Sequence, residues 1–483
     1  MISAATPLWT REDAETATGG RCAVPWRAHG VSIDTRTLAP GDLFVAISGP
    51  NHDGHDFVAK ALDAGAAAAV VSRVPEGAGA DAPLLVVNDT LRALEDLGRF
   101  ARRRTAARVI AITGSIGKTG TKEALRTALV GQATVFASEG SLNNHWGLPL
   151  SLARMPRDTA YAVVEMGMNH PGEIEPLTRM ARPHVAVVTT VERVHAAYFD
   201  SVEAIADAKA EIFAGVEPGG AAVLNRDNRQ YARLAAAADA AGIDRIVSFG
   251  RHDDAGVRLL IVAPEGVGSR IRVRVGAETI DCRIPVPGTH WVSNGLCVLA
   301  AAAAAAAGAD VARAAAALAG FTLPKGRGRA HSVDLAGGGF ELIDDSYNAS
   351  PVSMAAAFEV LGLTEPGPGG RRIAVLGDML ELGADAPALH ADLAEPLKAQ
   401  GIDLVFTAGP AMAHLFDALP SAMRGGHAGE SATLAPLVSA AVQAGDVVTV
   451  KGSAGSRMGV VVEALLALAD GGDVPTPRAV NGD

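Results

Sequence analysis

Residues 108–123 of this chain read RVIAITGSIGKTGTKE. The apolar run Val109–Thr113 predicts a strand, residues 113–119 form a short loop, and Lys122–Val130 is a helix-forming segment. A strand, a tight glycine-containing loop and a helix in this order make up the layout that holds a nucleoside triphosphate. The stretch therefore predicts an α/β fold and a nucleotide cosubstrate.

The loop supplies the groups that phosphate binding needs. Gly114 and Gly117 lack a Cβ, so backbone N–H groups can close around phosphate oxygens, and the start of the helix adds its positive end. Lys118 reaches the β- and γ-phosphates, and the hydroxyl of Thr119 is a ligand for Mg²⁺. The spacing is short: G-x-x-G-K-T replaces the common G-x-x-x-x-G-K-[ST], and Ile112 stands where the first glycine is usual.

Length and composition limit the possible functions. A chain of 483 residues is expected to form about three domains. The net charge of −11 argues against a nucleic-acid partner. Three cysteines far apart in sequence favour neither a disulfide framework nor a zinc site, which fits a reducing cytoplasm. Residues 1–18 have no apolar core typical of a signal peptide, and the apolar run Val298–Ala307 is too short to span a bilayer.

Three blocks follow one another along the chain. Residues 1–105 mix short strands and helices and end in the basic run Arg102–Arg104, which is predicted to be a solvated helix end. Residues 106–320 alternate strand and helix, which implies a mostly parallel sheet, and residues 321–483 form a second such unit. The predicted fold is therefore α/β with three domains: a small mixed α/β N-terminal domain, a central mostly parallel-sheet domain of the P-loop ATPase type, and a C-terminal Rossmann-like, doubly wound domain.

The apolar pattern also places the individual strands. In the first block they are predicted at Leu43–Ile47, Ala68–Val71 and Leu84–Val87. In the second they are predicted at Val109–Thr113, Tyr161–Glu165, Val185–Thr190, Ala221–Asn225 and Arg245–Phe249, with peripheral antiparallel strands near Leu259–Val262 and Ile271–Val275. In the third they are predicted at Phe340–Asp344, Ile373–Leu376, Leu404–Thr407 and Val447–Val450. An Ala-rich helix is predicted from Ser293 to Gly308.

Single residues after the phosphate loop allow two interpretations each. Glu165 ends an apolar strand, where its carboxylate either faces the Mg²⁺ site or simply faces water; the adjacent phosphate loop favours the metal site. His195 is, by itself, more typical of a structural or solvent-facing residue than of a metal or phosphate ligand. Lys209 is predicted from its spacing to be an exposed helical lysine.

Two further patterns concern the choice of ligand. Asn225-Arg226-Asp227-Asn228 superficially resembles the guanine-reading N-K-x-D, but the second and fourth positions fail, so a GTPase is disfavoured. In the third block, residues 344–351 (DDSYNASP) and residues 451–456 (KGSAGS) each follow an apolar strand. Because ligands bind at the carboxyl ends of strands in open α/β sheets, these two clusters predict a polar small-molecule site.

Together these stretches resemble the Mur ligases of peptidoglycan synthesis, and the matching pieces span nearly the whole chain. The first block carries Ser32–Arg36, Pro40–Ala46 and Asp53–Phe57; the second carries the phosphate loop, Ser141–Asn144, Gly147–Pro149, Glu165–Asn169 and Gly288–His290 with Asn294; the third carries Asp344–Pro351, Gly377–Met379, Glu381–Gly383 and Lys451–Ser453. The resemblance implies an ATP-dependent acid–amino-acid ligase that joins D-alanyl-D-alanine to UDP-N-acetylmuramoyl-tripeptide through an acyl phosphate. It thereby implies a cytoplasmic enzyme of cell-wall biogenesis, on which cell shape and division depend, with ATP and Mg²⁺ as cofactors. A monomer is expected, although the sequence leaves the oligomeric state open.

The resemblance also assigns domains and residues. Residues 1–105 would bind the UDP-sugar, 106–320 ATP, and 321–483 the dipeptide. ATP would be bound by Gly114, Ser115, Gly117, Lys118, Thr119, Asn294, Asp345 and an arginine. The catalytic group would comprise Lys118, Glu165, His195 and Lys209, with Thr119, Glu165 and His195 on metals and Lys209 open to carbamylation. The substrates would be contacted by Thr35, Arg36, Asn143, Asn144, Tyr347, Asn348 and Lys451.

Several points stay open at this level. The arginine could be Arg327 or Arg329, because the G-R pattern occurs twice. The chain has Thr189-Thr190, Val194-His195-Ala196, Trp291 and Ser350 where the family usually has Thr-Asn, Ala-His-Leu, Asn and Asn. Residue three of the tripeptide is either diaminopimelate or lysine. The rival hypotheses are a related ligase that adds one amino acid, such as a folylpolyglutamate synthetase, and a non-catalytic nucleotide-binding switch.

Overall fold

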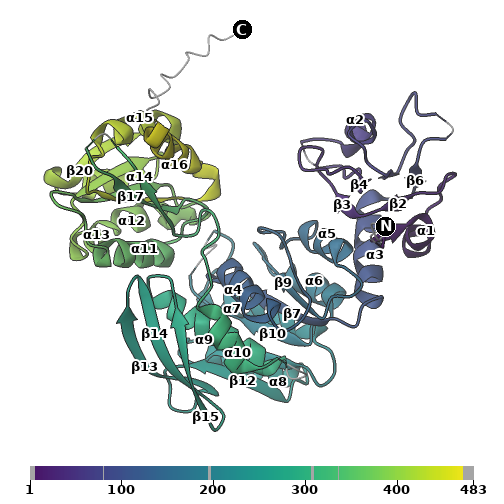
Figure 1. Cartoon of the computed structure of the whole chain (residues 1–483), viewed down its shortest axis with the longest axis horizontal. Helices are drawn as coiled ribbons and strands as arrows, with labels where there is room; N and C mark the ends of the chain where they lie inside the picture. The colour runs from purple at the N-terminus through teal and green to yellow at the C-terminus, as the bar shows by residue number, and fades with distance from the viewer. Residues whose placement is uncertain are drawn as a thin grey trace.

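The computed structural model describes residues 6–49, 51–79, 81–193, 197–305, 309–335 and 337–470. Three α/β units follow one another along the chain, each built around its own sheet (Figure 1). The central unit lies between the other two in space as well as in sequence, so the N-terminal and C-terminal units each adjoin it (Figure 1). The predicted three-domain α/β fold is confirmed.

The N-terminal unit is built on a four-stranded parallel sheet in the order β3-β4-β5-β6. These strands are β3 (Gly30–Ser32), β4 (Asp42–Val45), β5 (Ala68–Val71) and β6 (Leu84–Val86). A small antiparallel pair, β1 (Trp9–Thr10) and β2 (Arg27–Ala28), precedes it, and the helices are α1 (Arg11–Thr18), α2 (Val58–Asp63) and α3 (Thr90–Arg103). The sequence pattern missed β3, which is only three residues long.

The central unit holds a nine-stranded sheet in the order β15-β14-β13-β12-β11-β10-β7-β9-β8. Its parallel strands are β7 (Arg108–Thr113), β8 (Val135–Ala137), β9 (Tyr161–Glu165), β10 (Val185–Val188), β11 (Ala221–Asn225) and β12 (Arg245–Gly250). Strands such as Val109–Ile112 are apolar throughout and fully buried, as is typical of parallel strands covered by helices on both faces. The helices are α4 (Lys118–Val130), α5 (Gly147–Arg154), α6 (Ile174–Ala181), α7 (Val202–Ala210), α8 (Tyr231–Ala240), α9 (Thr289–Ala304) and α10 (Val311–Leu318).

The edge of this sheet becomes antiparallel, as predicted. β13 (Val257–Glu265) still pairs in parallel with β12, and β14 (Gly268–Val275) then returns antiparallel to β13. β15 (Glu278–Ile284), which the sequence pattern missed, completes the edge. The Ala-rich helix α9 begins at Thr289, four residues before its predicted start, and so brings His290 and Trp291 into its first turn.

The C-terminal unit contains a six-stranded sheet in the order β16-β17-β21-β18-β19-β20. The strands are β16 (Arg329–Val333), β17 (Phe340–Asp345), β18 (Arg372–Gly377), β19 (Leu404–Ala408), β20 (Arg424–Ala428) and β21 (Val447–Lys451), and only β16 runs antiparallel to its neighbour. Helices α11 (Pro351–Leu363), α12 (Ala386–Ala391), α13 (Ala394–Ala399), α14 (Met412–Ala418), α15 (Ser431–Ala441) and α16 (Gly459–Leu466) cover it. The pattern missed the edge strands β16 and β20, which are partly exposed and poor in apolar residues.

The basic run at the end of α3 differs from its prediction. Arg102 is only 6% exposed, and its guanidinium donates to the carbonyl oxygens of Ala181 and Arg182. Arg104 lies over the ring of Trp9, 4.1 Å from the centroid. The prediction of a solvated helix end is therefore wrong for these two arginines, because the end of α3 is covered where the N-terminal and central units meet.

Candidate active site

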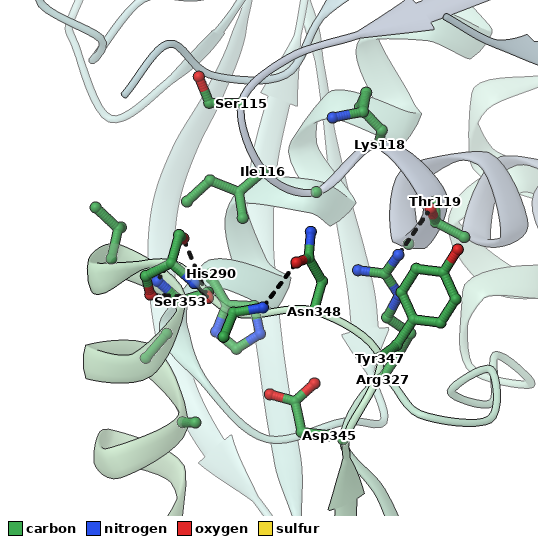
Figure 2. Close-up of a pocket in the computed structure, with 18 of the residues that line it drawn as sticks. Ser115, Ile116, Lys118, Thr119, His290, Arg327, Asp345, Tyr347, Asn348 and Ser353 are labelled. Carbon is green, nitrogen blue, oxygen red and sulfur yellow. Dashed lines mark hydrogen bonds between the residues drawn. The ribbon is translucent and has the colours of Figure 1, made fainter. Parts of the chain in front are cut away.

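A cavity of about 660 Å³ lies between the central and C-terminal units. The central unit contributes the phosphate loop, the ends of β9 and β10, and the first turn of α9. The C-terminal unit contributes the end of β17 with the turn after it, the first turns of α11, and the end of β21 (Figure 2). These contributors are carboxyl ends of parallel strands and amino ends of helices, where open α/β sheets bind ligands.

The phosphate loop has the backbone that its glycines predict. Gly114 and Gly117 adopt φ values of 148° and 85°, which side-chain-bearing residues rarely adopt. A Cβ at Gly114 would lie 1.9 Å from Thr189 Oγ1, so no larger residue fits there. Helix α4 begins at Lys118, four residues before its predicted start, and the Lys118 ammonium donates to Gly114 O at 2.7 Å.

Lys118 is partly buried at the cavity wall. Burial lowers the pKa of its ammonium, and the positive charge of Arg327 lowers it further, while the carboxylate of Glu165 opposes both. A phosphate group would replace Gly114 O as a stronger, charged acceptor for Lys118.

The two residues predicted to hold a metal, Glu165 and Thr119, lie within hydrogen-bond distance of each other. The Thr119 hydroxyl donates to Glu165 Oε2 at 2.9 Å, and Asn143 Nδ2 donates to Oε1 at 2.7 Å. Glu165 is 1% exposed, so its carboxylate is fixed at the cavity wall. Within the described residues, no group of three or more His, Cys, Asp or Glu side chains is placed to hold a metal ion. One carboxylate and one hydroxyl beside a phosphate loop fit Mg²⁺, which usually keeps several waters and shares phosphate oxygens.

The structure corrects the expectation that Lys209 is an exposed helical lysine. Its side chain on α7 is only 2% exposed. Burial lowers the pKa of its amine well below the usual value, and the nearby charge of Lys118 lowers it further. Lys209 therefore lies near enough to Lys118 to feel its charge, in a setting that favours a neutral amine, but it is not among the residues that line the cavity. The predicted metal ligand His195 lies outside the described residues.

Arg327 and Asn294 approach the phosphate loop from two elements. The Arg327 guanidinium donates to Thr119 Oγ1 at 3.4 Å and stacks 4.1 Å from the ring centroid of Tyr347. Asn294 Oδ1 would lie 2.8 Å from a Cβ at Gly117. Of the two candidate arginines, Arg327 lines the cavity, whereas Arg329 is exposed on the edge strand β16.

On the C-terminal side, Lys451 and Asp345 form a nearly buried ion pair. Lys451 Nζ donates to Asp345 Oδ2 at 2.6 Å and to Asn348 O at 2.9 Å. Burial raises the pKa of Asp345 even though the charge of Lys451 opposes the change. The adjacent carboxylate of Asp344 accepts from Gly326 N and from the Ser346 hydroxyl, and so braces the turn behind the cavity.

Other predicted residues lie outside this cavity. Thr35 and Arg36 belong to the N-terminal unit, where the Arg36 side chain pairs with Asp34 at 2.6 Å. Asn144 accepts from the backbone N–H groups of Trp146 and Gly147 and so caps the start of α5. Gly114 belongs to the phosphate loop but is not among the residues that line the cavity. The cavity brings together the phosphate-loop and C-terminal residues but not the N-terminal ones.

The structure also places in the cavity Glu192, which sequence reasoning did not single out, and His290, which it named only within the segment Gly288–His290. Glu192 follows β10 and lines the cavity, and burial raises the pKa of its carboxylate. His290 lines it as well, and burial next to Lys451 lowers the pKa of its ring to about 4. Sequence reasoning could have found Glu192 from its position, because it lies just beyond the carboxyl end of the strand next to the phosphate-loop strand.

Comparison with known proteins decides the family. Three family models match successive parts of the chain. They are described as "Mur ligase family, catalytic domain" (residues 27–102), "Mur ligase middle domain" (residues 112–303) and "Mur ligase, glutamate ligase domain" (residues 328–454). The chain belongs to the Mur ligase family. The resemblance seen in the sequence is thereby confirmed.

Full-length Mur ligase relatives agree with this assignment. The UDP-N-acetylmuramoyl-tripeptide–D-alanyl-D-alanine ligase of Escherichia coli (strain K12) is 36% identical over 90% of this chain and 93% of its own length. The ligase of the same name from Rickettsia prowazekii (strain Madrid E) is 32% identical over 94% and 99%.

Solved structures agree as well. The crystal structure of MurF from Acinetobacter baumannii has a TM-score of 0.81 at 29% identity and covers 95% of this chain and 99% of that one. MurF from Thermotoga maritima, solved in complex with ADP, has a TM-score of 0.74 at 26% identity, covering 92% and 98%. Among the described residues, no helix has the length and apolar character needed to cross a membrane.

Proposed function

We propose that this Mur ligase forms the amide bond between UDP-N-acetylmuramoyl-tripeptide and D-alanyl-D-alanine, with ATP converted to ADP and phosphate. The observation that carries the proposal is that the phosphate loop of the central unit and the Lys451–Asp345 pair of the C-terminal unit line the same cavity. Relatives that bear the name of this activity match over nine-tenths of the chain. The sequence-level hypothesis of an ATP-dependent ligase in peptidoglycan synthesis thus agrees with the comparisons.

The reaction needs activation because a carboxylate is a poor electrophile. The terminal carboxylate of the tripeptide attacks the γ-phosphorus of ATP, which gives an acyl phosphate and ADP. The amine of the dipeptide then attacks the acyl carbon, and phosphate leaves. Lys118 neutralises charge on the transferring phosphoryl oxygens, and Arg327 adds a second positive charge from the C-terminal unit. A bound Mg²⁺ would be held by Thr119 and Glu165 and would supply further charge neutralisation.

The remaining site residues are proposed in the following roles. Asn294, Arg327 and Asp345 fix the nucleoside, while Tyr347, Asn348 and Lys451 face the dipeptide. Thr35 and Arg36, with Asn143 and Asn144, serve the UDP-linked substrate. Lys209 is proposed to be carbamylated, since its buried neutral amine is the form that reacts with CO₂, and it would act together with His195 on a second cation.

The domain roles and the cellular setting are proposals of the same kind. Residues 1–105 bind the UDP-sugar, 106–320 bind ATP, and 321–483 bind the dipeptide. The enzyme works as a monomer in the cytoplasm, on small molecules rather than on nucleic acid, in keeping with its net charge of −11.

Phosphate release with different amine acceptors tests this proposal. With ATP, Mg²⁺ and UDP-N-acetylmuramoyl-tripeptide present, D-alanyl-D-alanine should support turnover and single amino acids should not. Turnover with a single amino acid but not with the dipeptide would overturn the acceptor assignment.

A second measurement separates an enzyme from a nucleotide-binding switch. Lys118→Ala should lose turnover by several orders of magnitude while its thermal unfolding stays close to wild type. Wild-type protein that binds ATP without acceptor-dependent phosphate release would contradict the enzyme proposal.

A further inference from the structure

The turn Asn225–Asn228 has no part in the mechanism above, although its sequence superficially resembles a guanine-reading motif. It follows β11, and β10 alone separates β11 from β7, the strand of the phosphate loop. The turn therefore lies at the same sheet edge as the phosphate loop, and Asn225 itself lines the cavity. Its side chains show what the turn does.

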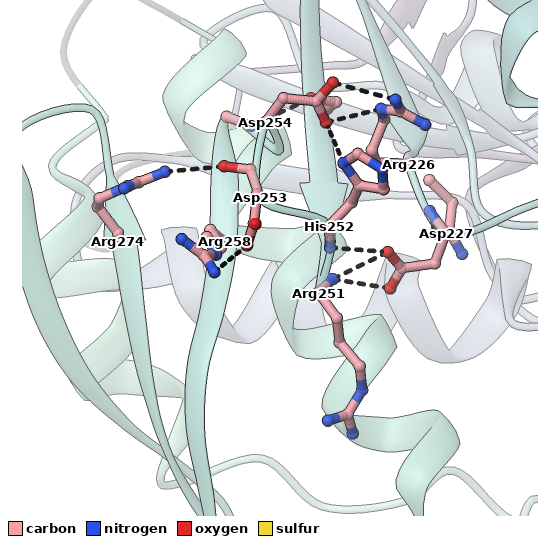
Figure 3. Close-up of polar contacts among 11 residues, drawn as sticks. Arg226, Asp227, Arg251, His252, Asp253, Asp254, Arg258 and Arg274 are labelled. Carbon is pink, nitrogen blue, oxygen red and sulfur yellow. Dashed lines mark hydrogen bonds and ion pairs between the residues drawn. The ribbon is translucent and has the colours of Figure 1, made fainter.

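Asp227 is hydrogen-bonded to the loop that follows β12, so its carboxylate is not free to bind a guanine base. Its carboxylate accepts from the backbone N–H of Arg251 at 2.7 and 3.0 Å and from that of His252 at 3.1 Å (Figure 3). Gly250 leaves room for this contact, because a Cβ there would lie 2.6 Å from Asp227 Oδ1. The Arg226 guanidinium lies 4.6 Å from the ring centroid of Tyr231 and forms a bidentate pair with Asp254 at 2.8 and 3.0 Å (Figure 3).

Asn228 reaches toward the phosphate loop instead. Its amide Nδ2 donates to Thr190 Oγ1 at 2.9 Å and to Val191 O at 3.0 Å. Its Oδ1 accepts from the backbone N–H of Gln230 at 2.9 Å, which fixes the orientation of the amide group. Asn228 thus ties the turn to the segment that follows β10.

That segment, residues 189–192, holds the phosphate loop along one side. Thr189 Oγ1 donates to Ile116 O at 2.6 Å, and the backbone N–H of Ser115 donates to Thr190 O at 2.9 Å. The Ser115 hydroxyl donates to Glu192 O at 3.0 Å and accepts from Glu192 N at 2.9 Å. Any shift of residues 190–192 therefore moves Ser115, and a shift that includes Thr189 moves Ile116 as well.

We propose that Asn228 is a positioning residue for the phosphate loop, acting through Thr190 and Ser115 on the affinity for the ATP phosphates. The inference deepens the proposed function and rests on it for the identity of the nucleotide. The hydrogen bonds between Asp227 and the backbone of residues 251–252 hold the turn in place. From this fixed turn, Asn228 restrains residues 190–191 through its two hydrogen bonds. A preorganised loop binds phosphate without first being ordered, so loss of the two Asn228 bonds lowers nucleotide affinity.

The test compares Asn228→Ala with Arg226→Ala in the same turn. Isothermal titration with the non-hydrolysable analogue AMP-PNP and Mg²⁺ should show about tenfold weaker binding for Asn228→Ala, in line with the loss of two hydrogen bonds. KM for ATP should rise by a similar factor, while KM for the two other substrates stays within about twofold. Arg226→Ala should match wild type, because its surface ion pair does not touch residues 189–192.

A double-mutant cycle with Thr190→Val tests the route of the effect. If Asn228 acts through Thr190, the double variant should lose less AMP-PNP affinity than expected from multiplying the fold-losses of the two single variants. Additive effects, or an Asn228→Ala affinity within about twofold of wild type, would overturn the inference. Should Asn228→Ala fail to fold, Asn228→Asp decides, because it keeps the acceptor for Gln230 N–H but cannot donate to Val191 O: weaker AMP-PNP binding than wild type supports the proposal, and unchanged binding overturns it.

The proposed function fails by a different outcome. Wild-type enzyme that binds AMP-PNP but releases no phosphate with the dipeptide contradicts the ligase assignment. The binding comparison between Asn228→Ala and Arg226→Ala needs no turnover and still tests the positioning role.

Discussion

The N-terminal unit meets the central unit through buried side chains, whereas the C-terminal unit meets it through polar groups. Trp9 is fully buried and donates from Nε1 to Ala153 O at 2.8 Å, and Leu150 and Ala153 of α5 belong to the apolar core of the N-terminal unit. Arg154 reaches back to Val31 O at 2.7 Å. These two units share one core and are expected to move as one body.

The contacts of the C-terminal unit with the central unit are of another kind. Described examples are the Thr289–Glu359 hydrogen bond at 3.2 Å, the Arg193–Asp385 ion pair at 2.7 Å and the Arg327–Thr119 hydrogen bond at 3.4 Å. Within the part of the chain that the structure describes, the two apolar cores of the C-terminal sheet contain no residue of the central unit, and Phe321, at the junction of the two units, packs into the central core. The reacting groups are thus split across the weaker interface, which is the arrangement that allows domain closure before chemistry.

The largest effect on stability is expected from Trp9→Ala at the buried interface. Removing the ring leaves a cavity in the shared core, so the free energy of unfolding should fall by about 3–5 kcal/mol, as measured by urea denaturation. Trp9→Phe keeps a ring under Arg104 and loses mainly the bond to Ala153 O, for a cost of about 1–2 kcal/mol. A loss below about 1 kcal/mol for Trp9→Ala would mean that the two units do not share a core.

At the polar interface, Arg327→Ala should change activity far more than stability. The guanidinium is the charge that the C-terminal unit places against Thr119, so kcat/KM for ATP is expected to fall about 10²–10³-fold. Arg329→Ala is the matched control and should remain near wild type, since Arg329 is exposed on an edge strand. A larger loss in Arg329→Ala would reverse the assignment of the nucleotide-contacting arginine.

The contrast between the interfaces also explains what the sequence could predict. The buried parallel strands β7 and β9 were predicted to within a residue, because a continuous apolar run has few alternative structures. The edge strands β16 and β20 were missed, because their residues are half exposed and their pairing depends on distant neighbours. The three-domain fold was therefore available from sequence, but the contacts between domains were not.

The candidate site divides in the same way. The phosphate loop and Glu165 were predicted from local pattern and spacing, and the structure brings them together. The burial of Lys209 depends on how α7 packs near Lys118, so spacing alone gave the wrong environment. Likewise, nothing local distinguishes Arg327 from Arg329, which the fold separates between the cavity wall and a sheet edge.

Acid should lower the free energy of unfolding through His290, which lines the cavity. The pKa of His290 is about 4 in the folded state because its ring is buried near Lys451, and it is near 6.5 when unfolded. Below about pH 6.5 the unfolded chain binds a proton that the native state does not, so stability falls as pH drops toward 4. The loss between about pH 8 and pH 5 should reach at most about 2 kcal/mol.

The control is urea denaturation of His290→Gln at the same two pH values, which measures how the free energy of unfolding depends on pH without this ring. The variant lacks the titrating ring and should lose that part of the pH dependence. Arg104, at the N-terminal interface, has a pKa of about 10 and stays charged throughout this range, so it should contribute nothing to the slope. An unchanged slope in His290→Gln would assign the acid sensitivity to other groups.

The smallest effect is expected for the Arg193–Asp385 pair, which joins the central and C-terminal units. Its side chains are 61% and 56% exposed, so water and salt screen the attraction that the 2.7 Å distance provides. A double-mutant cycle of Arg193→Ala and Asp385→Ala, followed by urea denaturation, should give a coupling energy below about 1 kcal/mol that shrinks further in about 0.5 M salt. A coupling above about 2 kcal/mol would show that this interface is held as firmly as a buried one. The C-terminal unit would then have to break a strong contact to close over ATP, and the division into one rigid body and one moving domain would be lost.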